Sequence, residues 1–338
     1  MAETQPIQVS VALATYNGAR YLPQQLESLL AQTRLPDELV IGDDGSRDET
    51  AEIIAEFTAR APFPVRLTVN EDNLGPARNF IATTLRCTGS VVFFCDQDDV
   101  WHPEKVARML SFMAENPGKW MALHDAAIID GTGAELGVTL AGQIRSAGGD
   151  PAEGHIAGCC MALDARLAAL FSHAGNPRLH DSWIEPIARR LGLVAYLDRP
   201  LIGYRRHGAN VSTSFMSETT RAGALSRFVY RAATAFGEEA QTSLRITHDW
   251  AQDARRAIEA NRAALLAAIP DACIAEALEE LAVVEEATAR RLTIHKATGS
   301  AVPKALRACW SAGDYRSPSG KLSLLRDLYA ICFPRSGN

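Results

Sequence analysis

The sequence predicts an α/β fold with a mainly parallel central sheet, followed by an α-helical region. Two observations support this prediction. Between residues 9 and 95, four short apolar runs alternate with helical patterns, and this alternation is typical of βαβ units. From about residue 218, Ala, Glu and Arg dominate with helical periodicity, and β-branched runs almost vanish. We therefore expect two domains, residues 1–217 and residues 218–338.

The elements of the first domain follow one another at regular intervals. Helical periodicity covers Tyr21–Gln32, and Ser46 and Glu49 have the spacing of a capping box for a helix that runs to about Arg60. A further helix begins within "NEDNLGPARNF". The four predicted strands are each an apolar run that ends in polar or turn residues: Val9–Ala14, Leu39–Ile41, Val65–Val69 and Val91–Cys95.

Composition and charge exclude several classes of protein. The 338 residues carry a net charge of −6, so electrostatics argues against a nucleic-acid-binding protein. The charge is uneven: from Ala287 onward nine Lys and Arg accompany two Asp, a net +7, which leaves −13 for the rest. The start has no basic and apolar signal-peptide pattern, and no run reaches the roughly 18 apolar residues of a membrane span. Seven scattered cysteines predict reduced thiols of a cytoplasmic protein.

Polar residues gather directly after the predicted strands. Ligands of parallel sheets bind at the carboxyl ends of the strands, so these residues should line one crevice. They form four clusters: Thr15–Asn17, Asp43–Asp44, Asn70–Asn73 and Asp96–Asp99.

The cluster "DQDD" places three carboxylates within four positions, which costs repulsion unless a cation neutralises them. Such oxygen ligands suit Mg²⁺ or Mn²⁺, which usually binds carboxylates together with substrate phosphates. The alternative is a solvated loop of aspartates that precedes a helix. One carboxylate of the pair Asp43–Asp44 can read a base or a ribose. No Walker A or G-x-G-x-x-G pattern follows the first strand, which argues against P-loop and dinucleotide enzymes.

At this point the chain resembles the family 2 inverting glycosyltransferases, which have the GT-A fold. The resemblance rests on "VSVALATYNGARYLPQQLESLLAQT", "ELVIGDDGSRDET", "NLGPARNF", "VVFFCDQDDVWHPEK", "LHDAAIID", "GCCMALD", "HDSWIEPIARRLG" and "YLDRPLIGYRRHGANVS". These motifs occur in the family's order and cover about residues 7–214. "DQDDVW", "HDSW" and "YRRHGANVS" are most similar to the rhamnosyltransferase-like bacterial members.

The resemblance implies a nucleotide site between the first two strand ends. Thr15 and Tyr16 would lie near the base and ribose, and Asp44 would accept the imide N–H of the base. Asp43 would assist or, alternatively, satisfy the turn, and Arg78 would meet the nucleotide or a phosphate unless it forms a surface ion pair. The neighbouring Asn17 and Asn73 complete the expected nucleotide-sugar site.

The resemblance also implies a metal site and a sugar pocket. Asp98, Asp99 and His207 are the expected metal ligands, with Asp96 as a further ligand or support. Asp125 would accept hydrogen bonds from the donor sugar. Trp101 would wall the sugar ring on the donor side and Trp183 on the acceptor side, the alternative for both being core packing.

Inverting transfer needs a general base that deprotonates the acceptor hydroxyl. Asp181 in "LHDSWIEP" matches the base of the family, although it could instead cap a helix over residues 182–191. Glu185 is the second candidate, on the acceptor side. His180 stands where the family often has an acidic or polar residue.

The C-terminal basic segment combines cations with bulky apolar residues, as interfacial amphipathic elements do. One expectation is contact with an anionic membrane, and the alternative is a helix that packs on the catalytic domain or on a second copy in a homodimer. The residues concerned are Arg307, Trp310, Tyr315, Arg316, Lys321, Leu324, Leu325, Arg326, Tyr329 and Phe333.

Together these features predict an inverting, Mg²⁺- or Mn²⁺-dependent hexosyltransferase that uses a nucleotide-sugar donor. The donor expected from the resemblance is dTDP-rhamnose, with a UDP-sugar as the alternative. The acceptor would be a growing, lipid-linked cell-surface glycan at the cytoplasmic face of the membrane. A nucleotidyltransferase, a catalytically inactive scaffold and a calcium-binding module are the rival interpretations. The first lacks a Gly-rich basic loop, and the last lacks an EF-hand pattern.

Overall fold

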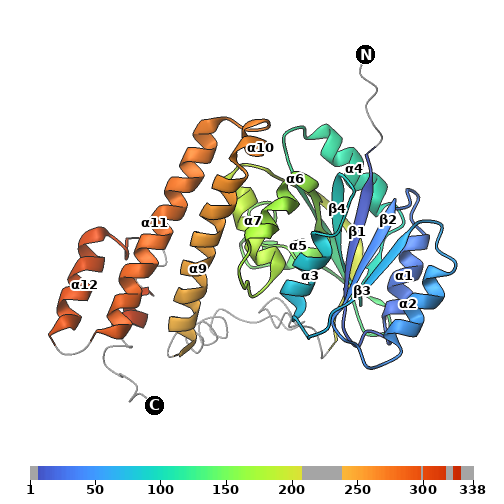
Figure 1. Ribbon diagram of the computed structural model, residues 1–338, viewed down its shortest axis with the longest axis horizontal. Helices are drawn as coiled ribbons and strands as arrows, with labels where there is room; N and C mark the ends of the chain where they lie inside the picture. Colours follow the sequence, from blue (N-terminus) through green and yellow to red (C-terminus); the bar gives the residue numbers. More distant parts are fainter. Residues whose placement is uncertain (1–6, 208–237, 298–299, 317–322, 329–338) are drawn as a thin grey trace. The chain divides into compact units, whose positions relative to one another are not determined.

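The structure is a computed structural model that describes residues 7–207, 238–297, 300–316 and 323–328 (Figure 1). The chain divides into two compact units, and the domain boundary expected at residue 217 lies outside the described residues. The first unit comprises Met1–Ser172, Asn176–Ser217 and Ala263–Cys273, and the second comprises His173–Gly175, Glu218–Arg262 and Ile274–Asn338.

The first unit is built on a nine-stranded sheet in the order β3-β2-β1-β4-β8-β6-β9-β5, with β7 paired to β6. The strands β3, β2, β1 and β4 run parallel, which confirms the predicted βαβ arrangement, whereas β8 is antiparallel to both of its neighbours. The strands are β1 Val9–Thr15, β2 Glu38–Asp43, β3 Val65–Val69, β4 Val91–Asp96, β5 Val100–Trp101, β6 Met121–Ile129, β7 Glu135–Thr139, β8 Met161–Asp164 and β9 Val194–Arg205.

Strands β1, β2 and β4 are buried along nearly their whole length. This explains why the sequence shows continuous apolar runs there instead of an alternation of apolar and polar residues, since helices cover both faces of a parallel sheet. In Figure 1, α1 and α2 lie on one side of these strands and α3 lies on the other. The helices of this unit are α1 Leu22–Leu30, α2 Thr50–Thr58, α3 Pro76–Thr84, α4 Lys105–Glu115, α5 Leu140–Ser146, α6 Ala165–Ala168 and α7 His180–Arg190.

The predicted capping box at the start of the second helix is wrong. Helix α2 begins at Thr50, and Glu49 at its N-cap makes no side-chain capping bond. Ser46 instead belongs to the turn after β2, where its N–H and its hydroxyl both donate to the Asp43 carboxylate. The Asp43 carboxylate therefore engages the N–H and the hydroxyl of Ser46, the two groups that a capping box would use at the helix start. It can do so because the Ser46 N–H lies in the turn and has no partner within the helix.

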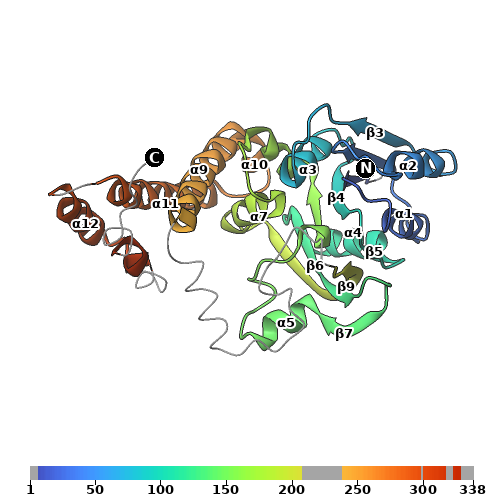
Figure 2. The same ribbon diagram turned by 90° about the horizontal axis from the view of Figure 1, so that it is seen from below.

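The register of the sheet brings the predicted polar clusters together. Thr15 pairs with Asp43 across β1 and β2, and Ala14 pairs with Asp96 across β1 and β4. Three strands therefore end at the same level of the sheet, as the sequence predicts. Strand β9 runs parallel to β6, and Figure 2 shows α5 and β7 beside them.

The second unit is helical, as the composition of this region predicts. Its described helices include α9 Glu238–Ala260, most of α11 Asp271–Lys296 and α12 Ala301–Ala312. Arg290 and Arg291 of α11 donate to Asp314 and Asp327, and the latter carboxylate is fully buried. The short helix α10 Arg262–Leu266 joins the two units in sequence.

The basic C-terminal segment is described only in part. The hydroxyl of Tyr315 donates to the buried Asp327 at 2.8 Å, so the hydroxyl end of this side chain lies toward the interior of the unit. Trp310 and Leu325 are exposed by 64% and 55%. Lys321, Tyr329 and Phe333 lie outside the described residues. Over the described ranges, no helix combines the length and the apolar character that crossing a membrane requires.

Candidate active site

A cavity of about 1100 Å³ opens at the carboxyl ends of β1, β2 and β4, a volume suited to a ligand of nucleotide-sugar size. Most of the sequence-predicted residues line it. Those that do are Thr15, Tyr16, Asn17, Asp44, Asn73, Asp96, Asp98, Asp181 and His207.

The loop after β1 is held rigidly at the mouth of the cavity. The Tyr16 N–H donates to Gln97 Oε1 at 2.9 Å, and Gln97 Nε2 donates to the Tyr16 carbonyl at 3.1 Å. Asn17 has φ = 46°, a left-handed conformation that Asn tolerates better than most residues, and its side chain accepts from the Arg47 N–H. The Tyr16 ring is 48% exposed. Tyr16 therefore lines the cavity from a loop whose backbone is fixed by these hydrogen bonds.

The two adjacent aspartates after β2 have different surroundings. Asp43 accepts hydrogen bonds from Thr15 Oγ1 and from the turn, and it does not line the cavity. These contacts agree with the alternative role of Asp43, in which its carboxylate accepts the hydrogen bonds of the turn after β2. Asp44 lines the cavity and accepts from the N–H groups of Leu74 and Gly75 at 2.8 Å each.

Asp44 is nevertheless not saturated. Asn70 Nδ2 donates to its Oδ1 at 2.9 Å, so three donors in all reach a carboxylate that can accept about four. Asn73 Nδ2 donates to the Asp44 carbonyl at 3.0 Å, which fixes the backbone beside it. One acceptor position of Asp44 therefore remains for a donor from a ligand.

The acidic loop after β4, residues 96–99, divides between cavity and core. Asp96 and Asp98 line the cavity, whereas Asp99 is fully buried behind them and accepts from the Arg205 N–H at 3.0 Å. Burial, followed by the charge of Asp98, raises the pKa of Asp99 to about 7. Burial and the charges of Asp99 and Asp98 also raise the pKa of Asp96 well above its usual range.

Asp98 and His207 meet at the cavity wall, with Nε2 of the histidine 2.7 Å from Asp98 Oδ2. This contact joins two expected metal ligands that lie 109 positions apart in the sequence. The third, Asp99, does not line the cavity, and its Oδ1 accepts from the Arg205 N–H. Asp96, Asp98 and His207 line the cavity, and their oxygen-rich chemistry fits Mg²⁺ or Mn²⁺.

A different group, Asp96, Asp99 and Cys159, has ligand atoms within 4.8 Å of one another. A hydrogen bond to Cys160 and burial raise the pKa of the Cys159 thiol well above its usual range. A protonated, buried thiol is a poor ligand for a hard ion such as Mg²⁺. This group lies partly in the core, so it does not replace the set at the cavity wall.

Asp181 lies in the first turn of α7 and is 7% exposed. Its Oδ2 accepts from the Gly158 N–H at 3.0 Å, and its Oδ1 accepts from the Ser182 N–H at 2.6 Å. Burial opposes the ionisation of Asp181, but hydrogen bonding to His155 and the charges nearby outweigh it and hold the pKa below its usual range. Asp181 is therefore an ionised carboxylate that faces the cavity.

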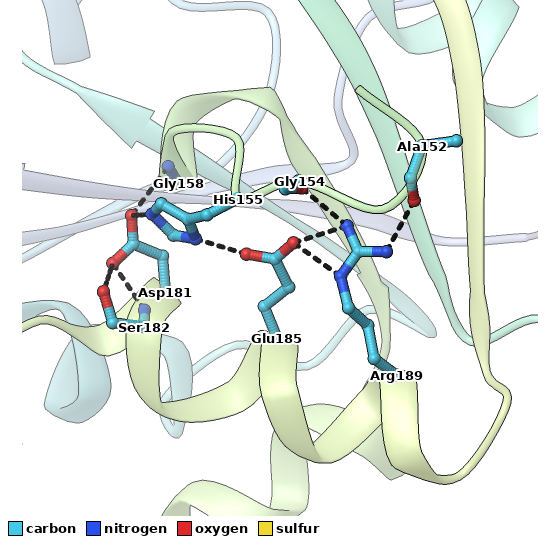
Figure 3. A network of polar contacts seen from close by, with 8 residues as sticks. All are labelled: Ala152, Gly154, His155, Gly158, Asp181, Ser182, Glu185 and Arg189. Atoms are coloured by element: carbon cyan, nitrogen blue, oxygen red, sulfur yellow. Dashed lines mark hydrogen bonds and ion pairs between the residues drawn. The ribbon is translucent and has the colours of Figure 1, made fainter. Parts of the chain in front are cut away.

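A network of polar contacts surrounds Asp181 (Figure 3). His155 lies between Asp181 and Glu185, and Glu185 Oε1 accepts from Arg189 Nε and Nη2 at 2.9 and 2.7 Å. Glu185 is 2% exposed and does not line the cavity, so it is not placed to contact an acceptor. This corrects its predicted position on the acceptor side.

Four further predictions do not match the positions of the residues. Trp101 and Trp183 are each 2% exposed and pack on Phe93 and Phe171, so core packing describes both and neither walls the cavity. Asp125 is buried away from the cavity, since its Oδ1 accepts from the N–H groups of Ala126 and Ala141 and so fixes the start of α5.

The fourth is Arg78, which is exposed at the third position of α3 and does not line the cavity.

Three residues of the site are not predicted from the sequence. Gln97 lies between the carboxylates of the acidic cluster, and His155 lies in a loop that contains no recognisable motif. Arg205, 1% exposed, donates to the Asp98 and Asp130 carbonyls at 2.6 and 3.0 Å and so holds the acidic loop from behind. The only signal for Arg205 was its place beside His207 in "YRRHGAN".

The chain matches the glycosyl transferase family 2 model over residues 10–132. It is 31% identical over 225 residues to an uncharacterised glycosyltransferase of Nostoc sp., which covers 63% of this chain and 69% of the relative. It is also 26% identical over 237 residues to the dTDP-rhamnosyl transferase RfbG of Shigella flexneri, covering 65% and 81% of the two chains.

Among solved structures, the crystal structure of S. aureus TarS residues 1–349 in complex with UDP aligns with a TM-score of 0.51. The alignment covers 83% of this chain and 91% of the TarS 1–349 chain, at 17% sequence identity. At this identity the likeness concerns the fold alone. The predicted GT-A fold with a helical C-terminal region is confirmed.

Proposed function

The chain belongs to glycosyltransferase family 2, and from this we propose that it transfers a sugar from a nucleotide-diphosphate donor to a glycan hydroxyl with inversion at the anomeric carbon. One observation carries the proposal. The ionised carboxylate of Asp181 and the acidic pair Asp96 and Asp98 face the same cavity, at the carboxyl ends of the central strands. A base and a diphosphate site are thereby available to one bound donor.

The chemical step follows from this arrangement. The acceptor hydroxyl attacks the anomeric carbon, the bond from that carbon to the phosphate oxygen breaks, and the diphosphate leaves with the electron pair. The hydroxyl proton passes to Asp181, which the lowered pKa keeps ionised before the reaction. Attack from the face opposite the leaving group inverts the anomeric configuration.

The nucleotide would lie toward the loop after β1. Tyr16 offers an exposed ring for stacking, and Asp44 has one acceptor position left for a base N–H. A divalent cation held by Asp96, Asp98 and His207 would neutralise charge on the departing diphosphate. The fit rests on the donor set that lines the cavity and on the pKa of Asp96, which burial and then the charges of Asp99 and Asp98 raise.

For the donor we propose one sugar nucleotide and an alternative, and for the acceptor only a class of glycan. Similarity to the Shigella dTDP-rhamnosyl transferase favours dTDP-rhamnose as the donor, and a UDP-sugar is the alternative. We propose a lipid-linked bacterial glycan as the acceptor, met at the inner face of the membrane. The net +7 after Ala287 and the exposed Trp310 and Leu325 support a membrane contact, which co-sedimentation with phosphatidylglycerol vesicles would test.

Donor hydrolysis tests the proposal directly. Purified protein is incubated with UDP-, GDP- and dTDP-sugars in the presence of Mn²⁺, Mg²⁺ or EDTA, beside Asp98→Asn and the control Asp72→Asn. Asp72 is an exposed aspartate that does not line the cavity. We expect slow, metal-dependent hydrolysis of one donor, which Asp98→Asn suppresses and Asp72→Asn leaves intact.

The same panel decides between this function and an inactive scaffold. A donor that binds in calorimetry without hydrolysis would mean that turnover needs the acceptor. Hydrolysis that persists in EDTA would contradict the metal dependence alone. Failure to bind any nucleotide or nucleotide sugar would remove the transferase function and leave the scaffold.

A further inference from the structure

His155 lies between the two carboxylates of α7, Asp181 and Glu185 (Figure 3). Its Nε2 is 3.5 Å from Asp181 Oδ2, and its Nδ1 contacts Glu185 Oε2. The histidine side chain is 49% exposed and lines the cavity, whereas Glu185 is buried. A neutral imidazole has one N–H and would turn a lone pair toward one of the carboxylates, so only the imidazolium satisfies both.

We infer that the imidazolium of His155 is a positioning residue for the base, which holds Asp181 ionised and directs its carboxylate into the cavity. This inference rests on the proposed function, because that function makes Asp181 the base. It assigns His155 no contact with the reacting atoms, and His155 keeps its proton throughout the transfer.

The position of His155 depends on the pairing of Glu185 with Arg189. Glu185 Oε1 is occupied by Nε and Nη2 of Arg189, which leaves Oε2 for the imidazolium. The four side chains therefore alternate in sign along a row, from Asp181 through His155 and Glu185 to Arg189. Because the row is neutral as a whole, the buried Glu185 has no excess charge to neutralise.

The same contacts fasten the loop that carries His155. Arg189 donates to the carbonyls of Ala152 and Gly154 at 2.6 and 2.8 Å, and the Gly158 N–H donates to Asp181 Oδ2 at 3.0 Å. The loop thus reaches α7 on both sides of His155. These contacts hold the loop without the imidazolium, so its loss would remove only the contacts of the ring with Asp181 and Glu185. The orientation of Asp181 is thereby coupled to the charge of His155.

The charges around the row agree with this role. Burial works against the charged form of His155, but Asp181 and Glu185 raise its pKa to about 10. On the same helix, burial lowers the pKa of His180 to about 4, so that neighbour is neutral. From β4, Asp96 faces Asp181 and adds negative charge when ionised. Without the imidazolium, burial and Asp96 would both favour the protonated, inactive form of Asp181.

The test is the pH profile of donor hydrolysis, in which water replaces the acceptor and Asp181 activates it in the same way. The donor is the one that the panel identifies, and the enzymes are wild type, His155→Gln, His155→Lys and the control His102→Gln. His102 is an exposed histidine that does not line the cavity.

For His155→Gln we expect kcat to fall about tenfold because the base is less well oriented, with donor KM changed less than about twofold. The ratio of its activity to that of wild type should also fall as the pH is lowered from about 6 to 4.5, because the pKa of Asp181 rises when the imidazolium is absent. For His155→Lys, which keeps a cation, this ratio should stay level, and His102→Gln should match wild type. A rate loss by one constant factor at every pH would overturn the inference.

A second measurement needs no donor. In full-length protein with ¹⁵N-labelled histidine, the His155 resonances, identified by their loss in His155→Gln, should show both ring nitrogens protonated at pH 7.5. A neutral ring at that pH would overturn the inference even if the protein is a transferase. Conversely, if both ring nitrogens are protonated but the protein binds no donor, the missing donor binding contradicts the proposed function. The protonated ring would still agree with the alternating charges of the row.

Discussion

The two ends of the cavity contrast in how their carboxylates are compensated. At the base end, Asp181 and Glu185 are each matched by a cation, His155 and Arg189, and the pKa of Asp181 is lowered. At the acidic end, the carboxylates of residues 96–99 crowd together, and the pKa values of Asp96 and Asp99 are raised. The base end is electrostatically complete as the protein folds, whereas the acidic end favours a further cation.

Arg205 supports the backbone of the acidic end. Its guanidinium donates to two backbone carbonyls and to Gln24 Oε1, and the ring of Tyr21 lies 4.8 Å away. These contacts fix the backbone of the acidic loop. The difference between the ends predicts that changes at the base end affect turnover, and changes at the acidic end affect donor and metal binding.

The largest expected effect is that of Asp181→Asn. Loss of the base should lower kcat by about 10²–10⁴-fold, while donor affinity stays within a few-fold of wild type, because the carboxamide keeps the size of the side chain and the acidic end is unchanged. Transfer or hydrolysis rates and calorimetry with the identified donor measure the two quantities. Asp249→Asn, a change at an exposed aspartate of α9 that does not line the cavity, is the control.

A loss of donor affinity as large as the loss of turnover in Asp181→Asn would contradict the division of roles between the ends. Asp98→Asn should show the opposite pattern, with weakened metal-dependent binding. The pair of variants therefore tests the contrast more sharply than either variant alone.

The next effect separates the two arginines that support the ends. Arg205→Met removes three hydrogen bonds behind the acidic loop, so we expect a loss of about 3 kcal/mol in the free energy of unfolding and weaker donor binding. Arg189→Met should cost less, about 2 kcal/mol, because His155 still pairs with Glu185 and a quarter of the arginine side chain is exposed. It should reduce turnover and spare donor binding.

Urea unfolding and donor calorimetry measure both effects, and circular dichroism at zero urea establishes that each variant is folded. Equal losses of donor affinity in the two variants would mean that the ends of the cavity are not independent.

The contrast between the ends also explains what could be predicted from the sequence. The parallel strands and the polar clusters after them were predictable, because apolar runs and turn residues are local signals. The spatial meeting of Asp98 and His207 came only from the order of family motifs. Long-range partners without a motif were missed, since Gln97 reaches a backbone 81 positions away and His155 reaches Glu185 across 30.

The errors have a physical cause of the same kind. The family resemblance implies that the tryptophans wall the sugar, with core packing as the alternative, and Trp101 packs on Phe93 in the core with Lys105 over its ring at 3.9 Å. Asp125 follows the strand pattern of a ligand site, yet its carboxylate satisfies backbone N–H groups at the bulge of β6. In each case burial decided the role of the side chain, and burial depends on the packing of segments that are distant in sequence.

The smallest expected effect is the pH dependence of the base end. The pKa of His155 rises from 6.5 to about 10 on folding, so its stabilisation is full below about pH 6.5 and is lost as the pH rises through 10. The pKa of Asp181 is lowered from 3.8, so its stabilisation is full above about pH 4 and is lost as the pH falls through its folded value. Both contributions are complete only between about pH 4 and 6.5.

Wild type should therefore exceed His155→Gln in unfolding free energy most at about pH 5.5, and the difference should shrink steadily toward pH 10. Since half of the His155 side chain is exposed, solvent screening limits the difference to about 1 kcal/mol, well below what the pKa shift alone would suggest. Urea unfolding of the two proteins at pH 5.5, 8 and 10 measures it, with groups common to both cancelling. A difference that does not change with pH would mean that His155 contributes packing instead of charge, and the electrostatic contrast between the two ends would then lose its support at the base end.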